Sequence, residues 1–212
     1  MDIFLVRHAE SATDSQGIYQ EQKFNSELSE TGKQQVQTLT KALSKLAINQ
    51  IFTSPAQCCM QSSVAVAQGL LLPIPITDQR LRGINYGLWA GKTKIQIQQE
   101  NPQDWELWQT DPQTLTFPEG ENISQLLERS LEFLHYLTQY DLQRVVVVTH
   151  DTIIRVLLTK LLMREFIDLW IYDLDAGGYS VIEWNGKFKQ VVKINANDHL
   201  EGITSDLSTY AL

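Results

Sequence analysis

The sequence predicts an α/β fold, a three-layer α/β/α sandwich with a mostly parallel sheet. Unbroken apolar runs at residues 3–6 and 145–148 are typical of strands that are buried on both faces. Segments with helical spacing of apolar residues alternate with short apolar runs, as they do in α/β architectures. Alternating residues on both sides of Asn185-Gly186 predict an antiparallel C-terminal hairpin at one edge of the sheet.

The remaining elements follow from local patterns of apolar residues. Helices are expected where apolar residues recur every three or four positions, and strands where they run together. In chain order the sequence predicts a strand at 3–6, a loop at 10–26, a helix at 28–46, a strand at 51–53, a helix that is capped by Ser54-Pro55 and continues to 71, a strand at 76–81, a partly helical stretch at 94–109, a helix at 122–140, a strand at 145–148, a helix at 153–163 and the hairpin at 179–194.

Length and composition predict one globular domain. The chain has 212 residues, which favours one domain over two, and its 43% hydrophobic content argues against disorder. We therefore expect a single domain over residues 1–212. Within it, residues 83–118 have the weakest periodicity and are predicted to form a small cap-like insertion. This segment contains Trp89, Trp105 and Trp108, of which at least two are expected to pack the cap on the core.

Charge and cysteine content limit the partners and the compartment. The net charge of −8 argues against a basic surface for nucleic acid. No apolar run approaches the roughly 18 residues of a membrane helix, and Arg7 comes too early for a secretory signal, so no membrane partner is expected. The two cysteines, Cys58 and Cys59, are neighbours, which rarely form a structural disulfide, so the sequence favours a reduced, cytoplasmic protein.

Two of the four histidines directly follow the two most apolar strands. They are His8 and His150, and ligands of open α/β sheets bind at the carboxyl ends of strands. Arg7 lies beside His8, and His150 precedes a helix whose N-terminus favours an anion. This set suits a phosphate, because a neutral imidazole can attack phosphorus while a second, protonated one stabilises the oxygen charge.

Two other interpretations of these histidines stay open. Each histidine can simply form a hydrogen bond at the end of its strand. A metal site is also chemically possible, with Glu10 and Asp151 as further ligands, although the sequence has neither an HExxH motif nor a spaced cysteine set.

Short motifs in a fixed order extend over nearly the whole chain. They are LVRHAES at 5–11, LSETG at 28–32, TSP at 53–55, LRG and GLWAG within 81–91, PEGEN at 118–122, VVTH at 147–150 and NDHL at 197–200. The ordered set resembles the histidine phosphatase superfamily, the phosphoglycerate mutase-like proteins. The resemblance implies a phosphohistidine mechanism in which His8 is the nucleophile and Arg7 and His150 hold the transferring phosphoryl group. It implies no metal and no other cofactor.

Two positions depart from the pattern of this family. The family usually has a second phosphate-binding Arg where this chain has Cys58, and a Glu general acid where it has Gly83. Losing one charge-assisted hydrogen bond costs roughly 1.5–3 kcal/mol, and losing a general acid costs roughly 10²–10⁴ in rate. We hypothesise that Asp151 donates the proton instead, as in the acid-phosphatase branch. The alternative is that Asp151 only caps a helix that begins at Thr152.

The resemblance also suggests which residues contact the substrate. Asp14 takes a position where mutase relatives often have a phosphate-contacting Asn, but a carboxylate repels a dianion, so a solvated loop position is the other interpretation. Arg80, Arg82 or Lys92 can supply the positive charge that Cys58 lacks, and Cys58 itself is expected to be a small, partly buried filler. The expected substrate-binding residues are Arg7, Ser11, Asp14, Arg82 and Glu121.

The predicted function is hydrolysis of phosphomonoesters of small metabolites through a phosphohistidine, weakened or made atypical by Cys58 and Gly83. The alternative is a catalytically degenerate member of the family, which binds a phosphorylated ligand or has a regulatory role but does not turn over. A phosphoglycerate mutase is a weaker candidate, because the chain is shorter than typical mutases. The sequence determines neither the substrate nor the oligomeric state.

Overall fold

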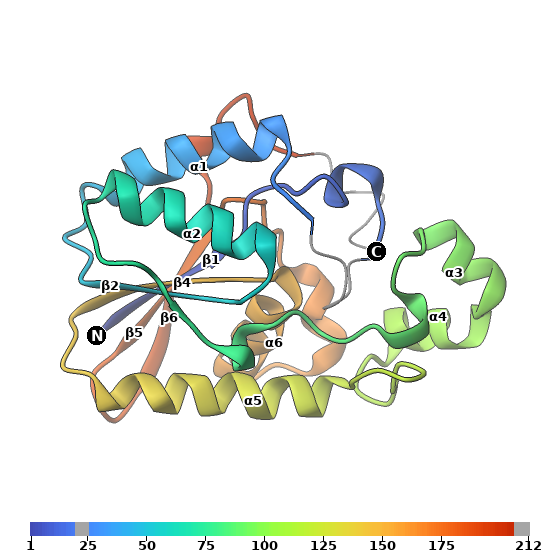
Figure 1. The fold of residues 1–212 in the computed structure, drawn as a ribbon. Coiled ribbons are helices and arrows are strands. Elements are labelled where there is room, and N and C mark those ends of the chain that lie inside the picture. Colours follow the sequence, from blue (N-terminus) through green and yellow to red (C-terminus); the bar gives the residue numbers. More distant parts are fainter. Residues whose placement is uncertain (20–25, 206–212) are drawn as a thin grey trace.

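A six-stranded sheet lies between two layers of helices in the computed structural model, which describes residues 1–19 and 26–205 (Figure 1). The strand order is β3 (Ile76–Thr77), β2 (Gln50–Thr53), β4 (Arg144–Thr149), β1 (Asp2–Arg7), β5 (Tyr179–Trp184) and β6 (Lys189–Ala196). The strands from β3 to β1 pair in parallel, whereas β5 is antiparallel to both β1 and β6. The predicted fold class, a mostly parallel sheet with an edge hairpin, is confirmed.

Side chains of the central strands alternate between two apolar cores, as the pleat of a strand requires. Ile3 and Leu5 of β1 belong to the core on one face of the sheet, and Phe4 and Val6 belong to the core on the other. The four consecutive valines of β4 alternate in the same way and are all fully buried. Because both faces are covered, these strands appear in the sequence as unbroken apolar runs.

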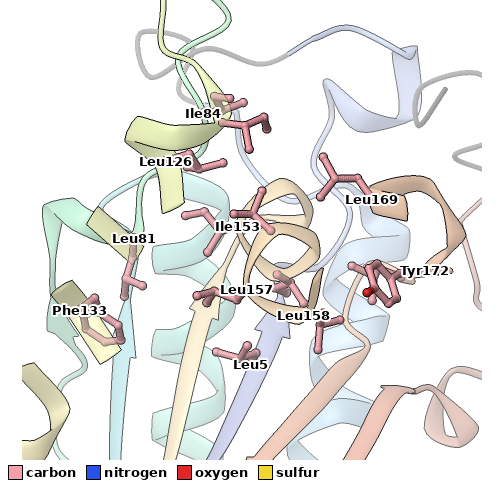
Figure 2. Close-up of a cluster of buried hydrophobic side chains, with 14 of the residues drawn as sticks. Leu5, Leu81, Ile84, Leu126, Phe133, Ile153, Leu157, Leu158, Leu169 and Tyr172 are labelled. Atoms are coloured by element: carbon pink, nitrogen blue, oxygen red, sulfur yellow. The ribbon is translucent and has the colours of Figure 1, made fainter. Parts of the chain in front are cut away.

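Helices α1 (Glu30–Leu43) and α2 (Gln57–Gly69) cover one face of the sheet, and α5 (Ile123–Tyr136) and α6 (Asp151–Leu161) cover the other (Figure 1). Figure 2 shows the core on the face that α5 and α6 cover, where Leu157 and Leu158 of α6 lie above Leu5 of β1. Side chains fix the helix starts: Ser29 caps α1, and Asn122 caps α5 in a capping box. None of the helices within the described ranges is long and apolar enough to span a membrane.

Three predicted boundaries were wrong. The strand expected at 76–81 is only Ile76–Thr77, because the chain then turns into the short 3-10 helix Gln79–Leu81 capped by Asp78. The helical stretch at 94–109 is two helices, α3 (Lys94–Glu100) and α4 (Pro102–Thr110), since a proline disfavours helical backbone at the residue before it. Helix α2 begins at Gln57 with no side-chain cap, so Ser54 does not cap it.

Helices α3 and α4 project beside the sandwich, as the green segment of Figure 1 shows. The tryptophans of residues 83–118 pack inward. Trp89, in the 3-10 helix Gly87–Trp89, stacks on Trp105 of α4 with 6.0 Å between ring centroids, and Trp108 of α4 meets Trp170 of the main sandwich at 4.8 Å. All three cap tryptophans are buried in the same apolar cluster as Leu5. This packing supports the interpretation of residues 83–118 as a cap on a single domain, which stays a prediction.

Candidate active site

The carboxyl ends of β1 and β4 bring His8 and His150 together. The two strands are parallel neighbours whose register pairs Arg7 with Thr149, so the residue that follows each strand lies at the same edge of the sheet. The ring centroids are 5.1 Å apart, and the rings meet edge to face at 71°. Both imidazoles are therefore close enough to contact one phosphoryl group.

A backbone carbonyl fixes the ring of His8. Its Nδ1 lies 2.8 Å from the carbonyl oxygen of Ala9, and a carbonyl only accepts, so Nδ1 carries a hydrogen. When the ring is neutral, the lone pair is then on Nε2. Nε2 is therefore the atom with which His8 can attack phosphorus.

The other imidazole, that of His150, is held by two residues that sequence analysis did not assign to the site. Its Nε2 lies 3.0 Å from Ser54 Oγ and 3.5 Å from Cys59 Sγ. A signal for Ser54 was present, because it directly follows β2, the parallel neighbour of β4, and so reaches the same edge of the sheet. Cys59 lies in the first turn of α2, and no sequence pattern distinguished it from a core residue.

Cys58, predicted to be a small, partly buried filler, is buried in the apolar core on the α1 and α2 face of the sheet, and its charge acts on His8. Burial lowers the pKa of His8, but the charge and hydrogen bond of Cys58, together with the carboxylate of Asp14, raise it to about 9. The hydrogen bond from Cys59 lowers the pKa of Cys58 to about 5; burial opposes this change and the positive charge of His8 reinforces it. An imidazolium–thiolate pair is therefore favoured at neutral pH.

The surroundings of His150 shift its pKa in the opposite direction to that of His8. Burial lowers its pKa well below 6.5, and the positive charges of His8, Arg129 and Arg7 act in the same direction, against the carboxylate of Asp151. A neutral ring is therefore favoured. This reverses the expectation of a neutral nucleophile beside a protonated second imidazole, because burial and the charge of His8 disfavour a proton on His150, whereas the charges of Cys58 and Asp14 favour one on His8.

Arg7 is buried at the same edge of the sheet. Its Nη1 donates a hydrogen bond of 2.6 Å to the carbonyl oxygen of Leu174, and its charge acts on both His150 and Asp151. A guanidinium has five N–H donors, so this bond orients the group without neutralising its charge. The structure thus brings Arg7, His8 and His150 to one place.

Asp151 is also at this edge, as an ionised carboxylate. Its Oδ1 accepts a hydrogen bond of 3.2 Å from the Thr152 hydroxyl, and Oδ2 lies 3.4 Å from Arg155 Nε. Burial raises the pKa of Asp151, but the charges of Arg7 and Arg155 and the hydrogen bonds from Thr152 lower it to about 2. Helix α6 begins at Asp151 itself, with His150 in the N-cap position, so Asp151 is not the cap of a helix that begins at Thr152.

Ser11 and Asp14 form a buried pair beside His8. The backbone N–H and the hydroxyl of Ser11 donate to Asp14 Oδ2 at 2.9 and 2.7 Å, and the same oxygen lies 3.9 Å from His8 Nδ1. Asp14 is only 2% exposed, so its interpretation as a solvated loop residue was wrong. The 3-10 turn Asp14–Gln16 folds the carboxylate inward, and substrate contact by either residue stays a prediction.

Arg129 of α5 holds the loop that carries Arg82 and Gly83. It donates to the carbonyl oxygens of Arg82 at 2.6 Å and Gly83 at 2.9 Å, and forms two 2.9 Å hydrogen bonds to the carboxylate of Glu121. The same carboxylate accepts the backbone N–H of Asn85. These contacts give Glu121 a role in fixing the loop, and substrate contact by Glu121 or the Arg82 side chain stays a prediction.

Gly83 lets this loop pass directly beside His150. A Cβ at Gly83 would lie 3.2 Å from Nδ1 and 3.3 Å from Cγ of the imidazole, closer than ordinary van der Waals contact. Any larger residue here would have to displace the ring or the loop.

The groups at this edge can bind an anion. They comprise the Arg7 guanidinium, the imidazolium of His8 and the N-terminus of α6, which has no side-chain cap. In the part of the chain that the structure describes, no three His, Cys, Asp or Glu side chains are grouped as a metal site. The donor set therefore suits a phosphoryl group.

Similarity to known proteins extends over most of the chain. Phosphoserine phosphatase 1 of Hydrogenobacter thermophilus is 30% identical over 199 residues, which cover 93% of each chain. An adenosylcobalamin/alpha-ribazole phosphatase of Escherichia coli is 23% identical over 197 residues, 92% of this chain and 96% of that one. Among solved structures, YhfR of Bacillus stearothermophilus has a TM-score of 0.85 and 26% identity, covering 91% of this chain and 95% of that one.

A family match agrees with these similarities and with the paired histidines. Residues 3–197 match the family described as the histidine phosphatase superfamily, branch 1. A match of this length takes in the strands that carry His8 and His150 as well as the cap between them. The chain therefore belongs to branch 1 of the histidine phosphatase superfamily.

Proposed function

We propose that this protein hydrolyses phosphomonoesters of small metabolites through a phosphohistidine on Nε2 of His8. The observation that carries the proposal is the 5.1 Å separation of the His8 and His150 rings at the edge where Arg7 is buried. The phosphatases of phosphoserine and alpha-ribazole phosphate among its relatives support a small phosphorylated substrate. The net charge of −8 disfavours polyanionic partners, and a cytoplasmic location is part of the proposal.

In the proposed mechanism the phosphoryl group lies against Arg7 and His150 at the N-terminus of α6. Nε2 of His8 attacks phosphorus, the bond from phosphorus to the leaving oxygen breaks, and that oxygen takes a proton from Asp151. Water then attacks the phosphohistidine, which releases inorganic phosphate and restores His8. Asp151 must first gain a proton, which the negative charge of a bound phosphoryl group favours.

The proposal includes a weakened activity at neutral pH. The attacking ring must be neutral, whereas the pairing with Cys58 favours its protonated form. Cys58 and Gly83 also stand where the family usually has an Arg and an acidic Glu, so the site has lost one positive group and one proton donor.

A second candidate, a binding or regulatory member without turnover, is favoured by one observation. An imidazolium at His8 beside Arg7 binds an anion well but has no lone pair on Nε2 for attack. Retained phosphate binding without hydrolysis would distinguish this candidate from the enzyme.

We expect His8→Ala to lower hydrolysis of phosphomonoesters by more than about 10³-fold, because the nucleophile is lost. The assay is a panel with phosphoserine, alpha-ribazole phosphate and p-nitrophenyl phosphate, followed by trapping of radiolabelled phosphate on the protein. His135→Ala, at an exposed position on α5, is the matched control and should keep both activity and label. Hydrolysis that persists in His8→Ala would contradict the proposal, and a wild type that only binds phosphate would favour the second candidate.

We expect Asp151→Asn to lower kcat for an alkyl phosphate by about 10²–10⁴, because an alkoxide leaves poorly without a proton. For p-nitrophenyl phosphate the loss should be much smaller, since a nitrophenolate leaves unprotonated. Steady-state kinetics with both substrates measure the difference. An equal effect on the two leaving groups would show that Asp151 orients Arg155 rather than acting as the acid.

We expect kcat/KM to rise with pH toward about 9, because only neutral His8 attacks. Cys58→Ser removes the thiolate, so the pKa of His8 should fall. The rising limb of the kcat/KM profile against pH should then move to lower pH. At pH 7 the kcat/KM of Cys58→Ser should exceed that of the wild type by up to about a hundred-fold, since the pKa of His8 in the wild type, about 9, lies about two units above this pH. His135→Ala, at an exposed position on α5, is the control, and a pH profile of Cys58→Ser with an unchanged rising limb would refute the pairing.

A further inference from the structure

We propose that Asn195 is a positioning residue for Arg7, and that it acts through the peptide unit that joins Leu174 to Asp175. Asn195 lies in the edge strand β6, outside the group of side chains that gather at the carboxyl ends of β1 and β4. Its effect on catalysis rests on the proposed phosphatase function, whereas its effect on the orientation of the Arg7 guanidinium does not.

This peptide unit is hydrogen-bonded at both of its ends. The carbonyl oxygen of Leu174 accepts the 2.6 Å hydrogen bond from Arg7 Nη1, and the N–H of Asp175 donates to Asn195 Oδ1 at 3.0 Å. The two groups belong to one planar peptide bond, in which the C=O and the N–H point in opposite directions. A rotation of this unit away from Asn195 therefore also turns the carbonyl oxygen away from Arg7.

The side chain of Asp175 adds a second contact to the same amide. Asn195 Nδ2 donates to Asp175 Oδ2 at 2.8 Å, and Asn197 Nδ2 donates to that oxygen at 2.7 Å. A carboxamide carries an acceptor and a donor side by side, so Asn195 binds both the backbone and the side chain of Asp175. Two hydrogen bonds fix the plane of the peptide unit, which a single one leaves free to swing.

A bulge in the C-terminal hairpin directs Asn195 toward this loop. Opposite Ser180 of β5, strand β6 has two residues, Ile194 and Asn195, where a regular register has one. Asn195 has a φ of +48°, in the left-handed region that asparagine tolerates better than most residues, and its N–H donates to Ser180 Oγ at 3.1 Å. Bulges re-aim side chains next to active sites, and this one brings the amide of Asn195 to Asp175.

The loop that contains Asp175 is also bound to the backbone of the site. The N–H of Gly177 donates to the carbonyl oxygen of Arg7 at 3.1 Å, and the N–H of Arg7 donates to the carbonyl oxygen of Gly178 at 3.1 Å. A Cβ at Gly178 would lie 2.5 Å from Asn195 Oδ1, so a side chain there would displace the amide. The loop thus orients both the main chain and the side chain of Arg7, and Asn195 anchors the loop to β6.

The first test is Asn195→Gly, which removes the amide but keeps the positive φ without strain. Water can satisfy the freed N–H of Asp175 but does not hold the peptide plane. We expect kcat/KM for p-nitrophenyl phosphate to fall about ten- to a hundred-fold, mainly through a higher KM, because Arg7 holds the phosphoryl group in the substrate complex as well as in the transition state.

The division between KM and kcat separates positioning from a loss of folded protein. Partial unfolding would lower kcat per total protein and leave KM unchanged. Asn185→Gly is the matched control, because it removes an exposed amide that binds two backbone N–H groups at the far end of the same hairpin. This control should keep both constants, and a loss in Asn195→Gly that lies in kcat alone would overturn the inference.

An exchange of the two side chains tests the contact itself. Asn195→Asp alone puts two carboxylates together, so we expect kcat/KM to fall. In the double variant Asp175→Asn/Asn195→Asp, the carboxylate at position 195 again accepts the N–H of residue 175, and the amide at position 175 donates to it. We expect the double variant to be more active than either single variant, whereas losses that simply multiply would overturn the inference.

The orientation of Arg7 is measured without substrate, by NMR of its guanidinium group with Arg7→Lys for assignment. We expect a hydrogen-bonded, slowly rotating group in the wild type and in Asn185→Gly, and a freely rotating one in Asn195→Gly. An Arg7 signal that is unchanged in Asn195→Gly would overturn the inference, as would a changed signal with an unchanged kcat/KM. A changed signal in a protein whose wild type hydrolyses no phosphomonoester would uphold the positioning of Arg7 and reject the phosphatase.

Discussion

The parallel pairing of β1 with β4 is the constraint on which the site depends. Its register opposes Arg7 to Thr149 and so places His8 and His150 at the same edge of the sheet, where their rings lie 5.1 Å apart. The burial of both strands keeps that register, because a slip by one residue would move every side chain to the other face of the sheet. The apolar runs that form the core are therefore also what positions the chemistry.

Electrostatics then separates the roles of two similar imidazoles. Burial disfavours the protonated form of both rings, but the charges of Cys58 and Asp14 outweigh it at His8, whereas the positive charges of His8, Arg129 and Arg7 reinforce it at His150. Among the side chains that act on His8, Cys58 raises its pKa most.

The fold and the histidine pair could be predicted from the sequence, because strand burial and strand-end position are local signals. Residues 3–6 and 145–148 are strands as expected, and the polar residues directly after them form the site. Contacts between distant segments could not be predicted. Ser54 was assigned to a helix cap and Asp14 to solvent, since nothing local reveals which side chain faces an imidazole. The break at Pro102 was a local signal that the periodicity obscured.

The central claim, that Arg7, His8 and His150 converge on one phosphoryl group, is tested most directly by a crystal structure with bound orthovanadate. The account predicts one anion whose oxygen or vanadium atoms contact the Nε2 atom of His8, the His150 ring and the Arg7 guanidinium together. An anion that binds elsewhere at saturating concentration, or that touches only one of the two imidazoles, would contradict the account.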